Sequence, residues 1–351
     1  LDNPTSSFFS AVFRIRYEVY TQLESKLLVD SSVIIFKDSS LVLEGKTISG
    51  IIDLKPSSET KSLLKVDVMD LRRNSRIKRY FEIDRTNVNC RQFFTMTLEG
   101  RNHPLSRNYV AADEEFIIRH TSGTSNAQVR YYNREFPLPK PPFSVESPKA
   151  FDFMADSTFA INLGEPLVFE REGFYHVQIS DSTKDGLTIF RYNVGFPEVK
   201  SVDKLIAPLR FINSNSEYRT LTEADFPKAE VDRFWLKLSG NPDRAKLLIE
   251  KFYSRVEDSN TFFSSHLEGW KSDRGLIYLI YGPPNIIYKN TESENWIYGE
   301  ESNPSSLGYT FYKVQNPFTD NDFRLDRSPI YKSSWYSAVD MWRQGRVYTD
   351  N

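Results

Sequence analysis

Residues 269–284 read GWKSDRGLIYLIYGPP, and this stretch carries the densest local signal in the chain. The polar segment 269–275 is bracketed by Gly269 and Gly275, which predicts a tight turn with unusual backbone angles or close packing. The run 276–281 is apolar on both faces, which predicts a buried strand in the centre of a sheet. Proline cannot donate to a strand ladder, so the Gly-Pro-Pro at 282–284 ends this strand.

Helical periodicity flanks this stretch. Residues 227–238 predict a short helix that Gly240 stops, and Asn241 caps a following helix of about twenty residues. Strands are predicted at 294–298 and 309–314, and a last helix, capped by Ser333 or Ser334, runs to Gly345. Helices beside a small antiparallel sheet indicate an α+β domain over residues 201–351.

The preceding part of the chain reads as short strands. Phe, Tyr and Trp make up 14% of the residues, a composition that suits half-buried sheet surfaces. Spacing and turn residues predict two immunoglobulin-like β-sandwiches, residues 1–88 and 89–200, so the fold class is multi-domain and mainly β. The predicted strands are 13–19, 27–36, 41–54, 62–71 and 77–84 in the first sandwich, and 93–98, 114–119, 128–133, 150–155, 158–163, 173–180 and 187–194 in the second.

A proline-rich segment, PLPKPP at 137–142, interrupts the second sandwich. It is either a ligand for an SH3-type domain or a stiff connection across the end of the sandwich, and we favour the connection.

Composition excludes several classes of site. The formal net charge of -2 gives no global field that would attract nucleic acid or an anionic membrane. Cys90 is the single cysteine, which excludes an intrachain disulfide and a thiolate metal site. Apolar runs are too short for a transmembrane helix. The sequence starts at Leu1 without Met, and we expect a mature exported protein whose leader or lipid-modified cysteine lies outside this numbering.

The C-terminal third resembles a known family. A helix, then EGWKSDRGLIYLIYGPP at 268–284 and ENWIYG at 294–299, is similar to the GWxTD domain family of Bacteroidetes-type bacteria. Ser272 stands where the name-giving motif has Thr, and both residues offer a hydroxyl. The resemblance covers roughly residues 220–350. It implies an exported or lipid-anchored protein with β-rich regions ahead of the domain, and it implies no particular reaction.

Catalytic constellations are not evident. Ser264, Ser265, His266 and Asp273 have the residue types of a triad, but no spacing forces them together. The histidines at 103, 120, 176 and 266 form no zinc motif.

Acidic residues leave two further possibilities. Asp320-Asn321-Asp322 with Asp326 resembles part of a calcium loop, and we favour a solvated acidic loop. The pairs Glu292/Glu294 and Glu300/Glu301 leave a glycosidase type of site open. We assign no catalytic residue, no metal and no cofactor.

Two groups of residues are candidates for binding. The aromatic side chains of the C-terminal third either line a groove for glycan or peptide or form the core, with Tyr288 and Tyr298 expected to be exposed. The candidate binding residues at motif positions are Trp270, Asp273, Arg274, Tyr281, Tyr288, Glu294, Trp296 and Tyr298. A basic patch, Arg72, Arg73, Arg76, Lys78 and Arg79, is either an anion-binding surface or a solvated hairpin turn, and we favour the turn.

These observations favour a non-catalytic interaction protein of the cell envelope, in the periplasm or associated with the outer membrane. The expected partner is another envelope protein, such as an outer-membrane β-barrel or its assembly apparatus, with no nucleic acid. The alternative is a protein that binds or processes surface glycan. An open cleft with paired acids and exposed Trp would favour glycan, whereas flat apolar patches would favour a protein complex.

Overall fold

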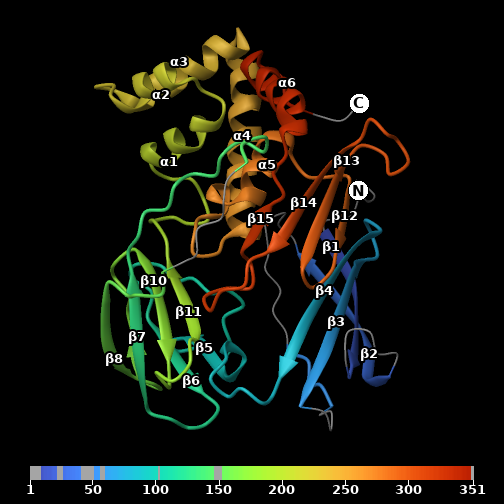
Figure 1. Cartoon of the computed structure of the whole chain (residues 1–351), viewed down its shortest axis with the longest axis vertical. Coiled ribbons are helices and arrows are strands. Elements are labelled where there is room, and N and C mark those ends of the chain that lie inside the picture. The colour runs from blue at the N-terminus through green and yellow to red at the C-terminus, as the bar shows by residue number, and fades with distance from the viewer. Residues whose placement is uncertain are drawn as a thin grey trace. The chain divides into compact units, whose positions relative to one another are not determined.

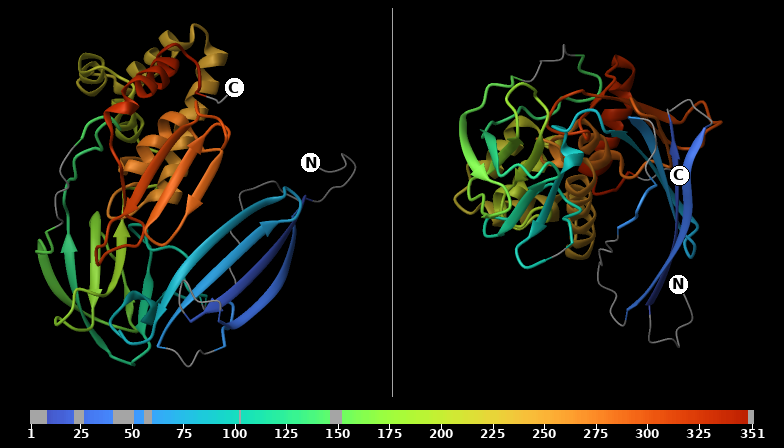
Figure 2. Two further views of the ribbon diagram at one scale, coloured as in Figure 1. Left: turned by 45° about the vertical axis from the view of Figure 1, so that its right-hand side comes forward. Right: turned by 90° about the horizontal axis from the view of Figure 1, so that it is seen from below.

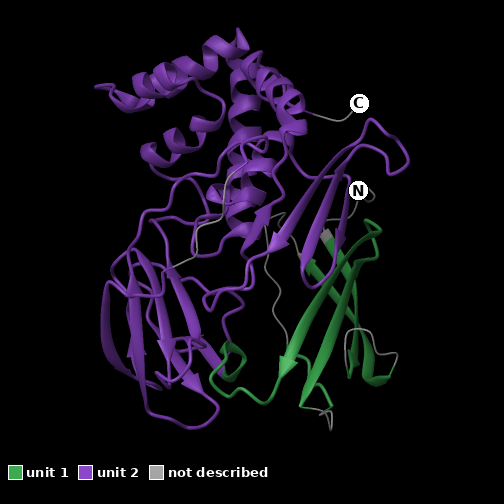
Figure 3. Ribbon diagram, in the orientation of Figure 1, with its two compact units in different colours: residues 1–93 green, residues 94–351 purple. Residues whose placement is uncertain are grey.

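The computed structural model describes residues 9–21, 27–40, 51–55, 60–101, 103–145 and 152–348. The chain forms two compact units, residues 1–93 and 94–351, which Figure 3 colours separately. The described residues are mainly β, with several antiparallel sheets, and their six α-helices all lie beyond residue 200. The boundaries of the three predicted domains stay a prediction.

The described part of unit 1 contains one antiparallel sheet (Figure 1). Its strands are β1 (Phe9–Tyr20), β2 (Leu28–Ser40), β3 (Lys61–Asp70) and β4 (Ser75–Asp84), in the order β2-β1-β3-β4. Tyr17 and Val19 of β1 are buried, as their alternation with polar residues predicts. Glu18 between them is buried as well, where it pairs with Lys65 at 2.6 Å. Of the strand predicted at 41–54, residues 41–50 lie outside the described residues and 51–54 form no strand.

Unit 2 begins with two sheets that share one core. One sheet holds β5 (Phe94–Leu98), β6 (Phe116–His120) and β9 (Pro166–Leu167), in that order. The other has the order β11-β10-β7-β8, with β7 (Asn126–Tyr132), β8 (Ser157–Asn162), β10 (Gly173–Gln178) and β11 (Leu187–Arg191). Phe116 and Ile118 from the first sheet pack with Val129, Val177 and Ile189 from the second.

The strand predicted at 150–155 is wrong for its described residues, 152–155, which form no strand. Arg134 donates to the carbonyl oxygen of Asp152 at 2.8 Å and also to that of Met154. These carbonyl groups are therefore hydrogen-bonded to a side chain and not to the backbone of a neighbouring strand. Phe153 packs against the ring of Phe318, with centroids 5.6 Å apart.

An aromatic cluster joins these sheets to the C-terminal part of unit 2. Phe318, which comes from the loop after β14, packs against the rings of Tyr132 and Phe174, and Phe190 and Tyr192 belong to the same cluster. The Tyr192 hydroxyl also donates to the carbonyl oxygen of Ser265 at 2.5 Å. Burial of this cluster ties the two parts together through apolar contact.

The proline-rich segment lies against the same C-terminal part. Leu138 and Phe143 pack on its core, and Ser328 donates its backbone N–H to the carbonyl oxygen of Pro142 at 3.1 Å. Within unit 2 the segment therefore connects the strands to the helical core.

The helices follow the predicted caps closely at α3 (Pro227–Ser239) and α4 (Pro242–Phe263). Gly240 ends α3 with φ 77°, the left-handed conformation that favours glycine, and Asn241 caps α4 by accepting from the N–H of Arg244 at 2.9 Å. Two short helices, α1 (Val202–Ile206) and α2 (Asn215–Thr222), precede them.

The apolar run at 276–281 is a helix, so the predicted central strand is wrong. It belongs to α5 (Asp273–Tyr281), which is buried on nearly all sides. A short apolar run fits a buried strand or a buried helix equally well. In this chain, hydrogen bonds at both ends of the run stabilise the helix. Ser272 caps the first turn, and Arg255 of α4 donates to the carbonyls of Leu279 and Ile280 at 3.1 and 2.9 Å.

A further antiparallel sheet packs on these helices (Figures 1 and 2). Its order is β12-β13-β14-β15, with β12 (Ile286–Lys289), β13 (Ser293–Tyr298), β14 (Leu307–Lys313) and β15 (Phe323–Leu325). Trp296, Tyr309 and Phe311 point into the core shared with α4 and α5. This part is the predicted α+β arrangement.

The last helix, α6 (Lys332–Arg343), begins earlier than predicted. Its N-cap position is Tyr331, and Ser334 donates to the carbonyl oxygen of Tyr331 at 3.0 Å, so neither predicted serine caps it. Within the described ranges, no helix combines the length and apolar character that a membrane crossing requires.

Candidate functional site

Gly269 and Gly275 of the GWKSDRG turn are required by close packing. A Cβ on Gly269 would lie 1.7 Å from the carbonyl oxygen of Ser259 in α4, and a Cβ on Gly275 would lie 1.9 Å from the carbonyl oxygen of Gly269. Neither glycine has a positive φ. Of the two reasons that the sequence allowed, close packing is therefore the one that applies.

Trp270 and Ser272 fix the turn between α4 and α5. Trp270 is buried, with the ring of Phe211 edge-on at 5.9 Å between centroids. The Ser272 hydroxyl donates to the carbonyl oxygen of Gly269 at 2.7 Å and accepts from the N–H of Gly275 at 3.0 Å. A threonine hydroxyl has the same donor and acceptor capacity, so the motif's Thr would serve as well.

Asp273 connects the turn to the edge of the C-terminal sheet. Its carboxylate accepts from the backbone N–H of Leu325 in β15 at 2.8 Å and from the Arg327 guanidinium at 2.9 Å. Charge-assisted bonds of this kind are stronger than neutral ones. Asp273 is thus occupied in holding β15 to the start of α5.

Arg274 forms a buried ion pair with Glu294. Their closest nitrogen and oxygen are 3.2 Å apart, and Arg274 also donates to the Asn321 side-chain oxygen at 2.6 Å. Lys289 lies 2.7 Å from Glu294, and the Trp296 indole N–H donates to it at 3.0 Å. Burial favours the neutral carboxyl, but these cations and hydrogen bonds hold the pKa of Glu294 below its ordinary value.

The acidic loop after β14 is part of this network. Asn321 contacts Arg274, and Asp322 is largely buried and accepts from the Asn316 amide at 3.1 Å. Burial raises the pKa of Asp322 to about 6. The favoured solvated loop is therefore wrong for Asn321 and Asp322, while the Asp320 side chain is 55% exposed. Among the residues that the structure describes, no group of three or more His, Cys, Asp or Glu is placed to hold a metal ion.

Most of the candidate aromatic residues belong to the core. Trp270, Tyr281, Trp296 and Tyr298 are buried, whereas Tyr288 is 47% exposed and donates to Glu301. The expected exposure of Tyr298 is wrong. Tyr298 lies two residues after Trp296 on the same inner face of β13, and its hydroxyl donates to the carbonyl oxygen of Gly282 at 2.9 Å.

The residue types of a triad have other partners. Ser264 accepts from the N–H of Gly269 at 2.8 Å, and Asp273 is bound to β15. His266 is partly buried beside Phe136, with ring centroids 4.8 Å apart, and burial of its ring lowers its pKa to about 4. The structure therefore does not assemble them into a nucleophile and its base.

The acidic pairs likewise form no matched site. Glu294 is buried with Arg274, whereas Glu292, Glu300 and Glu301 are exposed, and Glu301 accepts from the Tyr288 hydroxyl. A glycosidase needs two carboxyls that face one substrate in a cleft.

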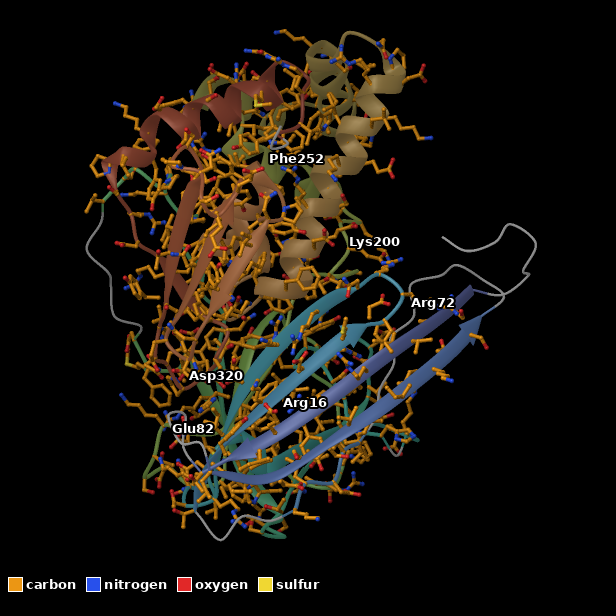
Figure 4. The ribbon with its side chains drawn as sticks, turned by 90° about the vertical axis from the view of Figure 1, so that its right-hand side faces the viewer. Arg16, Arg72, Glu82, Lys200, Phe252 and Asp320 are labelled. Carbon is orange, nitrogen blue, oxygen red and sulfur yellow. The ribbon has the colours of Figure 1, made fainter. Side chains whose placement is uncertain are left out.

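The basic patch spans the turn between β3 and β4 and the first half of β4, and its role stays a prediction. Arg72 and Arg73 lie in the turn between β3 and β4, where Figure 4 labels Arg72. Asp70 accepts from their backbone N–H groups at 2.9 and 3.1 Å. Arg76 is paired with Asp67 across the hairpin. Lys78 and Arg79 follow on β4 with exposed side chains.

The structure shows one feature that the sequence analysis missed. A depression of about 320 Å³ lies between β8 and the segment after β9. Its lining is mainly apolar and aromatic: Tyr131, Phe159, Ile161, Leu167, Phe169 and Tyr175. These residues are spread over four segments without a motif, so no local pattern pointed to them.

Comparison with known proteins places the motif in a family. The GWxTD domain model matches residues 173–344, a region that begins at β10 and so extends beyond the resemblance at 220–350. Comparison with curated proteins gives no match. The chain carries a GWxTD domain, and its residues 173–344 belong to the GWxTD domain family.

Proposed function

We propose that this chain is a non-catalytic interaction protein of the cell envelope, an accessory subunit of an outer-membrane protein complex for assembly or secretion. In this proposal the β-rich regions, arranged as immunoglobulin-like sandwiches, act as spacer or docking surface. The protein is exported, in the manner of a Bacteroidetes-type lipoprotein, to the periplasm or outer membrane. The partner is another envelope protein, such as a β-barrel or its assembly apparatus.

The observation that carries the proposal is the use of the motif side chains within the fold. Ser272 caps α5, Asp273 holds β15, and Arg274 is paired with Glu294. The hydroxyl of Ser272, the carboxylate of Asp273 and the guanidinium of Arg274 are thus engaged in contacts within the fold. A role through surface contact fits this arrangement better than a reaction.

The burial of the tryptophans also supports a protein partner over a glycan. All five Trp of the chain are buried: Trp235, Trp270, Trp296, Trp335 and Trp342. Sugar rings are usually bound by exposed aromatic faces, so the glycan alternative has less support.

The outer face of the C-terminal sheet is the contact surface in this proposal. Tyr288 and Tyr312 project from β12 and β14 on the face opposite Trp296, and they are 47% and 53% exposed. Exposed tyrosines on a flat sheet are common anchors in protein interfaces.

An affinity purification tests the proposal. Tagged wild-type protein is compared with a Tyr288→Ala, Tyr312→Ala variant in a mild-detergent extract of the envelope, and bound proteins are identified by mass spectrometry. Leu247→Ala is the matched control, because Leu247 is an exposed apolar residue on α4. We expect stoichiometric outer-membrane proteins with the wild type and the control, and loss with the double variant. No co-purified protein, together with binding on a glycan array, would favour the alternative.

A further inference from the structure

Strand β8 forms an edge of its sheet that is open in the described structure. It is the last strand in the order β11-β10-β7-β8, and among the residues described no strand pairs with its other side. Its sequence, Ser157–Asn162, has no charged residue and no proline. Edge strands that are protected against pairing usually carry one or the other.

The register shows which backbone groups face this open edge. Leu163, just after β8, donates its N–H to the carbonyl oxygen of Ser125 at 2.7 Å, in line with the pairing of β7 and β8. Antiparallel ladders alternate, so the backbone groups of Phe159 and Ile161 also point to β7. Those of Thr158, Ala160 and Asn162 therefore point away from β7, toward the open edge.

An apolar depression lies beside the same edge. Phe159 stands opposite Val129, a fully buried core residue, yet its side chain is 38% exposed. The facing sheet ends in the two-residue strand β9, which leaves the end of the shared core uncovered. The resulting depression of about 320 Å³ has stacked rings of Phe169 and Tyr175 in its lining, with centroids 3.9 Å apart.

We propose that β8 binds an extended segment of a partner polypeptide as an added strand, with an apolar side chain in the depression beside Phe159. Main-chain bonds to Thr158, Ala160 and Asn162 supply affinity, and the depression supplies selectivity for alternate apolar residues. This inference deepens the proposed interaction role and rests on it for the existence of a partner.

The length of β8 and the charges around it favour a peptide strand, and not a second copy of this chain, as the occupant of the open edge. A symmetric pair of β8 strands from two copies joins only six residues of each chain, whereas a stable interface uses roughly 20–30 residues a side. Strand addition by a peptide has no such requirement. Because β8 is uncharged and Glu170 and Arg171 at the rim have opposite signs, an uncharged, alternating apolar segment is the complement.

The test uses random displayed peptides of about eight residues, near the length of a typical strand. Peptides are selected on the full protein and counter-selected on Ala160→Lys, which puts a charge on the exposed edge. Gln128→Lys is the matched control, because Gln128 is exposed directly opposite Ala160 but lies in the interior strand β7. Circular dichroism verifies that both variants fold.

We expect alternating apolar peptides that bind the wild type and Gln128→Lys equally and Ala160→Lys roughly tenfold more weakly, the equivalent of one or two backbone hydrogen bonds. Hydrogen exchange of Thr158, Ala160 and Asn162 should slow when peptide is bound. The proposal is overturned if no such peptide is enriched, if these amides are already protected in the free protein, or if the wild type is a dimer that Ala160→Lys dissociates. These outcomes leave the affinity purification through Tyr288 and Tyr312 unaffected.

Discussion

Replacing Gly269 by Ala should destabilise the C-terminal part severely, because the new methyl group meets backbone. The Cβ would lie 1.7 Å from the carbonyl oxygen of Ser259, and contacts under 3.0 Å essentially never occur, so the turn must retreat from α4 by at least the difference, 1.3 Å. Overpacking in a close-packed core costs about 1–3 kcal/mol. Since backbone atoms of α4 cannot swing aside, we expect about 3 kcal/mol or more.

Gly308→Ala is the matched control. A Cβ on Gly308 meets nothing within 4 Å, and Gly308 has no positive φ. This variant should lie within about 0.5 kcal/mol of the wild type or be slightly stabilised, because Ala reduces the freedom of the unfolded chain. The assay is urea unfolding followed by Trp fluorescence, since every Trp lies beyond residue 230. A Gly269→Ala variant as stable as Gly308→Ala would refute the packing argument.

Three further predictions concern the polar groups around the turn. Ser272→Ala should cost about 1 kcal/mol and Ser272→Thr almost nothing in urea unfolding, because only the cap matters; equal losses would contradict this. Arg274→Met should cost about 1.5–3 kcal/mol, because Glu294 loses its arginine but keeps Lys289, and adding Glu294→Gln should recover part of that loss in a double-mutant cycle. Burial raises the pKa of Asp322 from 3.8 to about 6, so stability falls as the pH rises through this range. Asp322→Asn should therefore be more stable than the wild type at about pH 7.5, by at most about 3 kcal/mol, and should lose this advantage near pH 4; an advantage independent of pH would count against the burial argument.

Local signals in the sequence predicted local structure well. Gly240 and Asn241 mark the boundary of α3 and α4 because a left-handed residue and a side-chain cap act within one turn. Apolar and polar residues alternate around Tyr17 and Val19, and this period of two predicts the strand β1 because successive side chains of a strand point to opposite faces. At α5 the apolar run fits a strand or a helix, and the Ser272 cap with Asp273 in the first turn is the local feature that favours the helix.

Contacts between distant segments could not be predicted in this way. Arg274 lies 20 residues from Glu294 and 47 from Asn321, and no spacing rule pairs them. The burial of Tyr298 depends on which face of β13 meets α5, a property of the tertiary structure. The opening beside β8 exists because β9 is short, and neither strand indicates this alone.

The most direct test of the central claim separates the fold from the contact surface. Partner recovery in the affinity purification is measured for Tyr288→Ala, Tyr312→Ala and for Ser272→Ala, at a temperature where circular dichroism shows both to be folded. If the motif acts only by holding α4, α5 and β15 together, Ser272→Ala retains its partners and the tyrosine variant loses them. Loss of partners, or of a measurable reaction, in a fully folded Ser272→Ala would show that the motif itself makes the functional contact.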